Sequence, residues 1–415
     1  MNIQRKEGKC MLYIPLNLAM EELFSRINKL DERDTGEQLL HRALRVRVYP
    51  SKRQQKLINT TLNCCRFVWN HMLGRNNKIY ERRNEHLGYI AMQNLLPGMK
   101  KYLPWLKDAD SQALKYACRQ LDNAFNRFFQ HISGFPTFKS KRNSKQSYTT
   151  TKASSIKYRR GKVSLPLVGN LSSKDKRELP YDAIITKATV TKDHGKYYVS
   201  IQYKVNRFIQ PIMPKADTTI GIDYKSDGLC VDSNGICANM PHFYQDAEDI
   251  LGWEQHKLAR KVGYRKGEKA SNNFKRQQER VFKKTRHIAN QRQDFLHKQS
   301  TLIAKTYDCV CAETLNMKAM SNKGFGNGKA TMNNGYGMFL KMLQYKMQER
   351  GKPFVQVDKW FPSSQLCSCC GYRNKRVKNL DVRTWRCPVC GTVHNRDKNS
   401  GINIKYEGLR MLGVL

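Results

Sequence analysis

The chain has 415 residues, of which 40% are hydrophobic and 26% are charged. This length predicts two to four domains of roughly 100 to 200 residues each and excludes a small scaffold held mainly by disulfides. The 75 Lys and Arg residues against 34 Asp and Glu residues leave a formal net charge of +41, which favours nucleic acid as a partner. The best apolar run, at 11–20, is broken by Pro15 and Asn17 and is too short for a membrane span. We therefore expect a soluble cytoplasmic protein.

The first third of the chain combines strand and helix patterns. Residues 1–40 have mixed charge and only a weak helical pattern. RALRVRVYP, at 42–50, alternates apolar residues with arginines, which predicts a half-buried strand with a basic outer face. Apolar residues recur every three or four positions at 54–80 and again at 111–132. Two amphipathic helices are expected there, the second capped by Asp110 or Ser111.

Strand patterns return after these helices. The segment 134–155 mixes aromatic with basic residues and fits either a solvated linker or a strand that contacts nucleic acid. Strands are expected at 156–168 and at 184–205, where Asp193-His194-Gly195 is typical of a hairpin turn. Helices enclosed by strands of similar character predict a β-barrel with a helical insertion. Two prolines within 206–217 indicate a domain boundary.

A long basic helix is predicted next. The segment 257–298 contains 14 Lys and Arg residues and three acids. This surplus favours contact with phosphate over a merely solvated helix face. A seven-residue apolar recurrence predicts a narrow buried stripe along this helix. The stripe consists of Phe274, Val281, Ile288, Phe295 and Leu302, and the neighbours Phe282, Ala289, Leu296 and Ile303 repeat with it.

Four of the 13 cysteines have the spacing of a zinc site. Each CxxC pair places two sulfurs on one tight turn, and the glycines Gly371 and Gly391 follow the two pairs directly. Two such turns supply four thiolates for tetrahedral Zn²⁺ and leave no open position for water, so the zinc is expected to be structural. Cys369 does not fit this spacing. The expected ligands are Cys367, Cys370, Cys387 and Cys390.

Three acidic residues are candidates for a catalytic site. Asp223 ends a predicted strand in 218–238, which continues into a hairpin with an Asn234-Gly235 turn. Glu313 follows an apolar run, and Asp397 opens a helical stretch just beyond the cysteine pairs. Each acid alone is weak evidence, because an Asp after a strand usually caps a turn.

Together the three acids predict a metal site. Acids that converge from separate elements would repel one another unless divalent cations lay between them. Two Mg²⁺ ions about 4 Å apart would suit oxygen ligands and phosphodiester hydrolysis. Asp227, Asp232 and Asp358 are alternative contributors to this site. The Gly-rich segment 324–337 is interpreted either as a mobile lid or as a simple connector.

Several motifs together resemble one protein family. GIDYKSDG, AETLNMKAM, the CSCCG and CPVCG pairs and NRDKNSGINI occur in this order. They are similar to the three RuvC motifs and zinc ribbon of the TnpB family, the transposon-encoded RNA-guided DNA endonucleases related to compact type V CRISPR effectors. RALRVRVYPSKRQQKLINTTLNCCRFVWNHML and GFPTFKSKR resemble the family's start and its internal basic motif. By motif position, the resemblance implies that Asp223, Glu313 and Asp397 are the catalytic Mg²⁺ ligands, with Asp223 bridging both ions.

The resemblance also implies an α+β multidomain architecture and a set of partners. Guide RNA is the expected cofactor beside Mg²⁺ and Zn²⁺, and double-stranded and displaced single-stranded DNA are the expected partners. Tyr224-Lys225 and Asn395 depart from the usual motifs without removing a ligand. The implied domains are an N-terminal extension at 1–40, a wedge-like β-barrel at 41–53 and 134–214, a helical recognition insertion at 54–133, an RNase H-like (RuvC) nuclease at 215–363 and 395–415, and a zinc ribbon at 364–394.

Three other functions are weighed against this one. A compact type V CRISPR effector is the nearest alternative. A non-cleaving RNA-guided DNA-binding regulator is expected to lack one or more of the acids, whereas all three are present here. A transposase that joins strands itself is disfavoured, because no two of the ten histidines have the His-x-His spacing of its metal pair.

Overall fold

The computed structural model divides the chain into two compact units. One unit runs from Gln38 to Arg207, and the other contains the chain from Phe208 to Leu415. The predicted N-terminal extension lies outside the described residues as far as residue 36, and the first strand begins at Glu37. No helix within the described ranges is long and apolar enough to cross a membrane. The structure describes residues 37–141, 145–226, 228–264, 268–322, 328–379 and 381–415.

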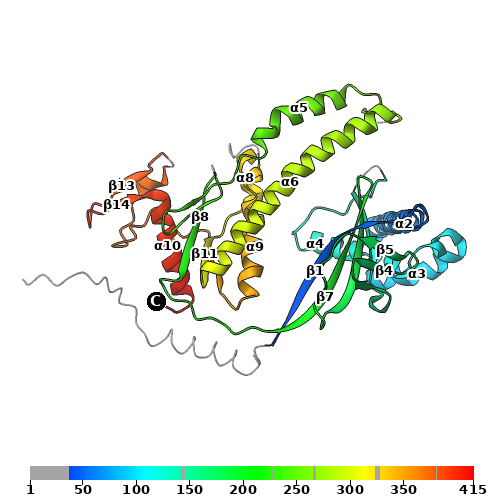
Figure 1. The fold of residues 1–415 in the computed structure, drawn as a ribbon, viewed down its shortest axis with the longest axis horizontal. Helices are drawn as coiled ribbons and strands as arrows, with labels where there is room; N and C mark the ends of the chain where they lie inside the picture. The colour runs from blue at the N-terminus through cyan, green and yellow to red at the C-terminus, as the bar shows by residue number, and fades with distance from the viewer. Residues whose placement is uncertain (1–36, 142–144, 227, 265–267, 323–327, 380) are drawn as a thin grey trace, which may run out of the picture. The chain divides into compact units, whose positions relative to one another are not determined.

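The unit Gln38–Arg207 is built on a seven-stranded sheet (Figure 1). Its strand order is β2-β6-β7-β1-β5-β4-β3. The hairpin predicted at 184–205 is confirmed as β6 paired with β7, and its turn lies at His194 and Gly195, which have φ of 45° and 75°. A closed barrel would require the two end strands of this order, β2 and β3, to pair with each other. Among the described residues the order ends at these strands, so a closed barrel stays a prediction. The strands are β1 (Glu37–Tyr49), β2 (Lys145–Thr150), β3 (Lys157–Arg159), β4 (Lys162–Leu165), β5 (Gly169–Ser173), β6 (Ile184–Asp193) and β7 (Lys196–Phe208).

Helices occupy the chain between β1 and β2. Ser51 and Gln54 form a capping box at the start of α2, and the Asp110 carboxylate caps α4 as predicted. α3 was not predicted, since it buries only Met92 and Leu96 and contains a proline. The strand interpretation of 134–155 is confirmed for the part that forms β2. The helices are α2 (Lys52–Arg83), α3 (Tyr89–Tyr102), η1 (Pro104–Asp108), α4 (Ser111–Phe129) and, after β2, η2 (Ala153–Ser155).

The second unit contains a five-stranded mixed sheet with the order β10-β9-β8-β11-β12. β8 is parallel to β11, and β11 is parallel to β12, whereas β9 is antiparallel to both β8 and β10. The carboxyl ends of β8, β11 and β12 therefore meet at one edge of the sheet. The strands are β8 (Thr219–Tyr224), β9 (Cys230–Asp232), β10 (Cys237–Ala238), β11 (Cys309–Glu313) and β12 (Phe354–Val357).

Helices pack against both faces of this sheet (Figure 1). Side chains of β11 alternate, so that Val310 and Ala312 share a core with α6 and α9, whereas Cys309 and Cys311 pack with Ile404 of α10. The buried strand β11 is thus a continuous apolar run because it is covered on both sides. The helices are α5 (Gln245–Ala259), α6 (Asn272–Thr306), α7 (Met317–Met320), α8 (Gly328–Asn334), α9 (Tyr336–Gln348) and α10 (Arg396–Met411).

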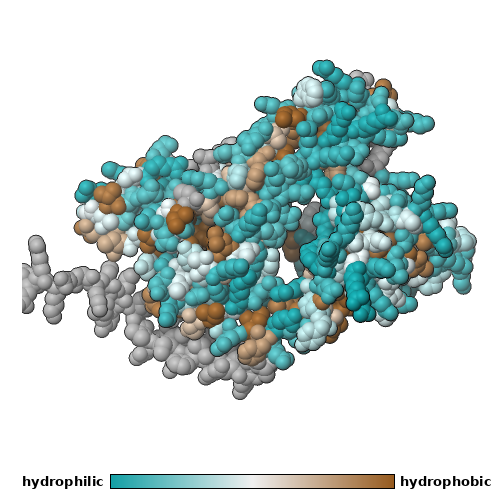
Figure 2. Space-filling model, in the orientation of Figure 1, coloured by the Kyte–Doolittle hydropathy of each residue, from teal (hydrophilic) through white to brown (hydrophobic). Residues whose placement is uncertain are grey.

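Two expectations for the second unit need correction. The predicted long helix is confirmed as α6, but its stripe is wrong at Leu302, which is exposed. The small residues Ser300 and Ala304 are buried instead, because α9 packs closely along this side of α6. The loop expected at 324–337 is wrong from residue 328 onward, where α8 forms, and 323–327 lie outside the described residues. Figure 2 shows mainly hydrophilic residues on the visible face of α6.

Glycines bring α10 unusually close to the sheet. A Cβ on Gly221 of β8 would overlap the carbonyl oxygen of Gly401 in α10. A Cβ on Gly408 would overlap the Cys311 sulfur, and one on Gly401 would lie 2.9 Å from the carbonyl carbon of Asp232. Because α10 carries Asp397 in its first turn, these contacts determine where that carboxylate lies.

Replacing Gly401 with alanine is expected to destabilise the second unit. The added methyl group has no free space, so overpacking should lower the free energy of unfolding by about 1 to 3 kcal/mol. Gly252→Ala is the matched control, because Gly252 is also helical but has nothing within 4 Å of its would-be Cβ. That control should be neutral or stabilising by up to about 1 kcal/mol. Urea unfolding of both variants checks the prediction, and equal stabilities would contradict it.

Candidate active site

The structure brings the three predicted acids to one edge of the five-stranded sheet. In the parallel register of β8 and β11, Ile222 pairs with Ala312. Asp223 and Glu313 are the next residues on their strands, so they are neighbours at the carboxyl edge. Asp397 lies in the first turn of α10, which packs against β8 and β11.

The three carboxyl groups interact electrostatically. Desolvation raises the pKa of Asp223 well above its ordinary value, and the charges of Glu313 and Asp397 raise it further, while a hydrogen bond with Ser400 opposes the increase. Burial also raises the pKa of Glu313, against hydrogen bonds with Ser363 and Asp223. Burial and mutual repulsion therefore favour the neutral forms of Asp223 and Glu313 when no cation lies between them.

Two serine hydroxyls connect the acids to the surrounding elements. Ser400 of α10 donates to Ser363 over 2.9 Å, and Ser363 Oγ lies 3.5 Å from Glu313 Oε1. Asn403 donates to the Ser363 carbonyl over 2.7 Å. Asp397 Oδ1 lies 3.7 Å from Arg383 Nη1. These contacts restrict the positions of the Glu313 and Asp397 carboxyl groups.

Ser363 and Ser400 were not identified from the sequence. Ser400 had a usable signal, since it lies three residues after Asp397 and therefore on the same helix face. Ser363 had none, because it reaches Glu313 only through the folded loop after β12.

The alternative acids have structural roles where the structure describes them. Asp232 Oδ1 accepts hydrogen bonds from the backbone N–H groups of Asn234 and Ile236, so it holds the turn after β9. Asp358 Oδ1 accepts from the backbone N–H of Trp360. Asp227 lies outside the described residues. We therefore retain Asp223, Glu313 and Asp397 as the candidate ligands.

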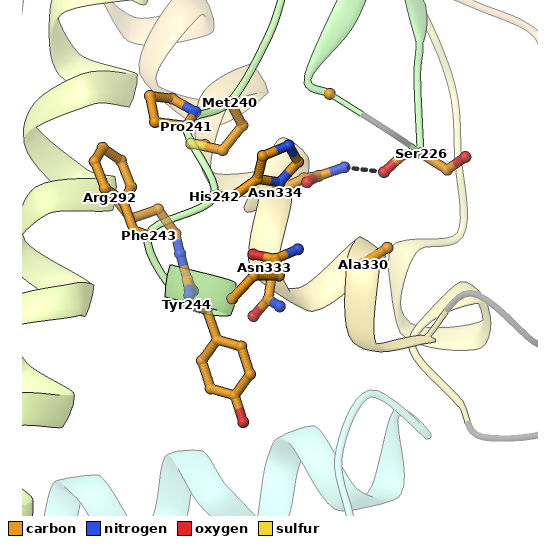
Figure 3. A pocket seen from close by; sticks show the side chains of 12 residues that line it. Ser226, Met240, Pro241, His242, Phe243, Tyr244, Arg292, Ala330, Asn333 and Asn334 are labelled. Carbon is orange, nitrogen blue, oxygen red and sulfur yellow. Dashed lines mark hydrogen bonds between the residues drawn. The ribbon is translucent and has the colours of Figure 1, made fainter. Parts of the chain in front are cut away.

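A small cavity lies next to the strand that carries Asp223 (Figure 3). Ser226, three residues after Asp223, forms part of its wall, together with His242, Arg292 of α6 and Asn333 of α8. The Asn333 side-chain nitrogen is buried and has no hydrogen-bond partner among the described residues. The cavity volume is about 140 Å³, below the roughly 300 to 1,000 Å³ of pockets for larger ligands. Its donors suit one phosphate group or one base.

The four predicted cysteines also converge. Their ligand atoms all lie within 4.8 Å of one another, and Cys369 is exposed and outside the group. The sulfurs of Cys367 and Cys390 are 3.5 Å apart, as are those of Cys370 and Cys387. These separations are far longer than a disulfide bond of about 2.0 Å. They approach the roughly 3.8 Å between ligands that 2.3 Å bonds in a tetrahedral zinc site require.

A buried histidine adjoins the cysteine group. His394 Nε2 lies 3.0 Å from Cys367 Sγ, and the His394 ring packs against Trp385 at 4.7 Å between ring centroids. His394 follows the second CxxC pair closely but was not among the predicted site residues. The strands β13 (Thr384–Arg386) and β14 (Val393–Asn395) form a two-stranded sheet that carries both aromatic side chains, and η4 (Lys375–Lys378) precedes them.

The chain has relatives among known proteins. A relative from Streptomyces pristinaespiralis, named "Putative RNA-guided DNA endonuclease", is 31% identical over 378 residues, which are 90% of each chain. The chain belongs to the TnpB family. A further TnpB relative, "Putative RNA-guided DNA endonuclease InsQ" of Escherichia coli K12, is 28% identical over 386 residues, covering 89% of this chain and 93% of InsQ.

Family models and a solved structure extend the comparison to particular segments of this TnpB chain. The models described as "Probable transposase" and "Cas12f1-like, TNB domain" match residues 200–323 and 336–404. A "Helix-turn-helix domain" model matches 40–85, which here form most of β1 and the single helix α2. The Cas12f1 chain of a cryo-EM complex with sgRNA and target DNA superposes with a TM-score of 0.53 at 14% identity, covering 89% of this chain and 99% of Cas12f1. The mixed α/β fold predicted from sequence is therefore confirmed.

Proposed function

We propose that this TnpB protein is an RNA-guided DNA endonuclease of a transposable element, with Asp223, Glu313 and Asp397 as its metal ligands. The single observation that carries the proposal is the convergence of these acids at one sheet edge. The names of the relatives from Streptomyces and E. coli support the same function. Guide RNA, double-stranded DNA and displaced single-stranded DNA are the proposed partners.

The proposed domains agree with the arrangement of elements. Residues 215–363 and 395–415 would form the RuvC-like nuclease, and the strand order β10-β9-β8-β11-β12 with α10 on one face supports an RNase H-like core. Residues 41–53 and 134–214 would form the wedge, because strands β1 to β7 belong to one sheet. The helical insertion at 54–133 lies between β1 and β2 in the sequence. Residues 364–394 would form the zinc ribbon.

The chemistry follows from the ligand set. Two Mg²⁺ ions bound by these carboxylates would supply the charge that stabilises the attacking and leaving oxygens of a phosphodiester bond. Hard oxygen donors suit Mg²⁺, and a bound cation would offset the burial and repulsion that raise the pKa values of Asp223 and Glu313. Ser363 and Ser400 would keep the carboxylates oriented.

Zinc is proposed for the four cysteines. Thiolates prefer Zn²⁺ over Mg²⁺, and four protein ligands close the coordination shell, so this ion would be structural. His394 Nε2–H would then donate to the Cys367 thiolate, as outer-shell partners of zinc ligands commonly do.

The decisive experiment begins with the RNA that copurifies with the full-length protein. Sequencing this RNA defines its 3′ end, and a plasmid library that carries the matching DNA beside randomised flanks is then incubated with Mg²⁺. We expect cleavage next to the matching sequence. Asp223→Asn should lower the cleavage rate by about 10³-fold or more, equivalent to at least about 4 kcal/mol of barrier, while the RNA remains bound.

Asp232→Asn is the matched control for this test. The asparagine oxygen can still accept hydrogen bonds from the backbone N–H groups of Asn234 and Ile236, so the turn is kept while one negative charge is removed. Asp232 also pairs with Ile222, next to Asp223. Cleavage that survives Asp223→Asn, or that is lost equally in Asp232→Asn, would refute the assignment.

A further inference from the structure

The loop after β12 is fixed to Glu313 at both ends. In the parallel register of β11 and β12, Val357 pairs with Glu313. Ser363, six residues later, reaches Glu313 Oε1 with its hydroxyl group. The five residues at 358–362 therefore form a short loop held beside one of the candidate metal ligands.

Local hydrogen bonds determine which aromatic side chain of this loop is exposed. Asp358 Oδ1 accepts from the Trp360 N–H over 2.7 Å, and the Asp358 carbonyl accepts from the Phe361 N–H over 3.1 Å. This turn directs Phe361 into the small core formed by Val355, Val357 and Ile404. Trp360 is left 79% exposed.

Trp360 is the most exposed of the five tryptophans. Trp69 and Trp385 are only 8% and 6% exposed, and Trp105 and Trp253 are 42% and 58% exposed. Single exposed apolar residues are common on proteins, so the position of Trp360 is what matters. It is three residues from Val357 and three from Ser363, so its Cα lies within about 11 Å of the Cα atoms of these two neighbours of Glu313.

We propose that Trp360 is a stacking platform for an unpaired nucleobase of the DNA strand that is cut. This inference rests on the proposed nuclease function and adds a binding site to it. Lys359 Nζ lies 4.8 Å from the centroid of the Trp360 ring, so a cation that could pair with a phosphate of the strand accompanies the ring.

The chemistry of stacking specifies the ligand. Bases inside a duplex already stack on both faces, whereas a base of single-stranded DNA has a free face for an indole ring. Every base offers such a face, so the site should accept any sequence. Asp358 contributes by fixing the turn rather than by contacting DNA.

The test measures binding rather than cleavage, so that it can fail separately from the proposed nuclease function. Full-length protein with its copurifying RNA carries Asp223→Asn, and no Mg²⁺ is added. The probes are mixed-sequence single-stranded oligonucleotides with 2-aminopurine at different positions, whose fluorescence falls when the base stacks. Trp360→Ala should weaken binding about 5- to 150-fold and abolish the fluorescence change. Trp360→Phe should retain most of both.

Trp253 provides the matched control. It is 58% exposed on α5, and Lys257 Nζ lies over its ring at 3.2 Å from the centroid, so it has the same chemistry away from the sheet edge. Trp253→Ala should bind single-stranded DNA within about twofold of the parent. Three results would each overturn the proposal: unchanged binding by Trp360→Ala, equal loss in Trp253→Ala, or equal loss of duplex binding. Failure of the unsubstituted protein to cleave DNA that matches its RNA would instead count against the nuclease function.

Discussion

Replacing Asp223 with asparagine is expected to make the metal-free protein more heat-stable while it abolishes cleavage. Asp223 is desolvated and lies among the negative charges of Glu313 and Asp397. Asparagine removes one of these charges at nearly constant volume, so the repulsion in the folded state falls. Each kcal/mol of relieved repulsion should raise the melting temperature by roughly 2 to 4 °C.

The pH dependence of stability follows from the same carboxyl groups. The pKa values of Asp223 and Glu313 are raised in the folded chain, so the folded state binds more protons than the unfolded state above about pH 4, the ordinary carboxyl value. Stability of the metal-free protein therefore falls as pH increases from about 4 through the raised pKa values, and levels off above them. Asp223→Asn should flatten this decline. Melting curves between pH 4 and 8 without added Mg²⁺ measure it.

With Mg²⁺ added, the unsubstituted protein should have a higher melting temperature than Asp223→Asn, the reverse of the order expected without metal. A ligand that binds only the folded state stabilises it in proportion to the logarithm of its concentration above the Kd. The unsubstituted protein should gain melting temperature as Mg²⁺ is added, and Asp223→Asn should gain much less. Asp232→Asn should behave like the unsubstituted protein in both series. A lower melting temperature for metal-free Asp223→Asn would contradict the proposed crowding of charges.

Local patterns in the sequence were sufficient for the elements that carry the candidate ligands. β8 and β11 are apolar runs that end at an acid, and α10 begins at a clear cap, where the Asn395 side chain accepts from the Lys398 N–H. The spacing of the cysteine pairs likewise predicted which sulfurs meet. Such signals depend only on residues that are close in the sequence, so they can be recognised without knowledge of the tertiary structure.

Features that depend on tertiary packing could not be predicted from the sequence. α5 buries only Leu251 and Glu254, so it shows no regular apolar period and was missed. The buried side of α6 includes Ser300, whose hydroxyl accepts from Lys346 of α9, and a hydrophobic pattern cannot predict a polar seam of this kind. The close approach of α10 at Gly221 and Gly401 joins residues 180 positions apart. Long-range contacts of this type determine how the acids are oriented, although local signals predicted which acids they are.

Loss of the proposed zinc is expected to unfold the segment 364–394. The core of this segment consists of Val377, Trp385 and the ligands Cys367 and Cys387, with few further apolar contacts. Folded units below about 40 residues usually need a metal or disulfides, and structural zinc contributes about 10 to 16 kcal/mol in small peptides. Cys370→Ser should therefore lower the zinc content from about one ion per chain to nearly none.

Trypsin can report the unfolding directly, because the segment carries six exposed basic residues. Cleavage at these positions should become rapid in Cys370→Ser, or after a zinc chelator is added to the unsubstituted protein. Cys369→Ser is the matched control, since Cys369 is the adjacent cysteine but lies outside the group. Zinc content and trypsin resistance that are unchanged in Cys370→Ser would contradict the assignment. The basic residues are Arg373, Lys375, Arg376, Lys378, Arg383 and Arg386.

Unfolding of the segment 364–394 should also disturb the candidate Mg²⁺ ligand Asp397. Asn399 of α10 donates to the Leu366 carbonyl over 2.6 Å and accepts from the Ser368 N–H over 3.0 Å, so the first turn of α10 is attached to the chain around Cys367. Unfolding the cysteine segment removes these contacts and frees Asp397, which belongs to the same turn. Cleavage should therefore fall after zinc removal even in excess Mg²⁺, and restored Zn²⁺ should recover it. Full cleavage by zinc-free protein would show that α10 holds Asp397 without the ribbon.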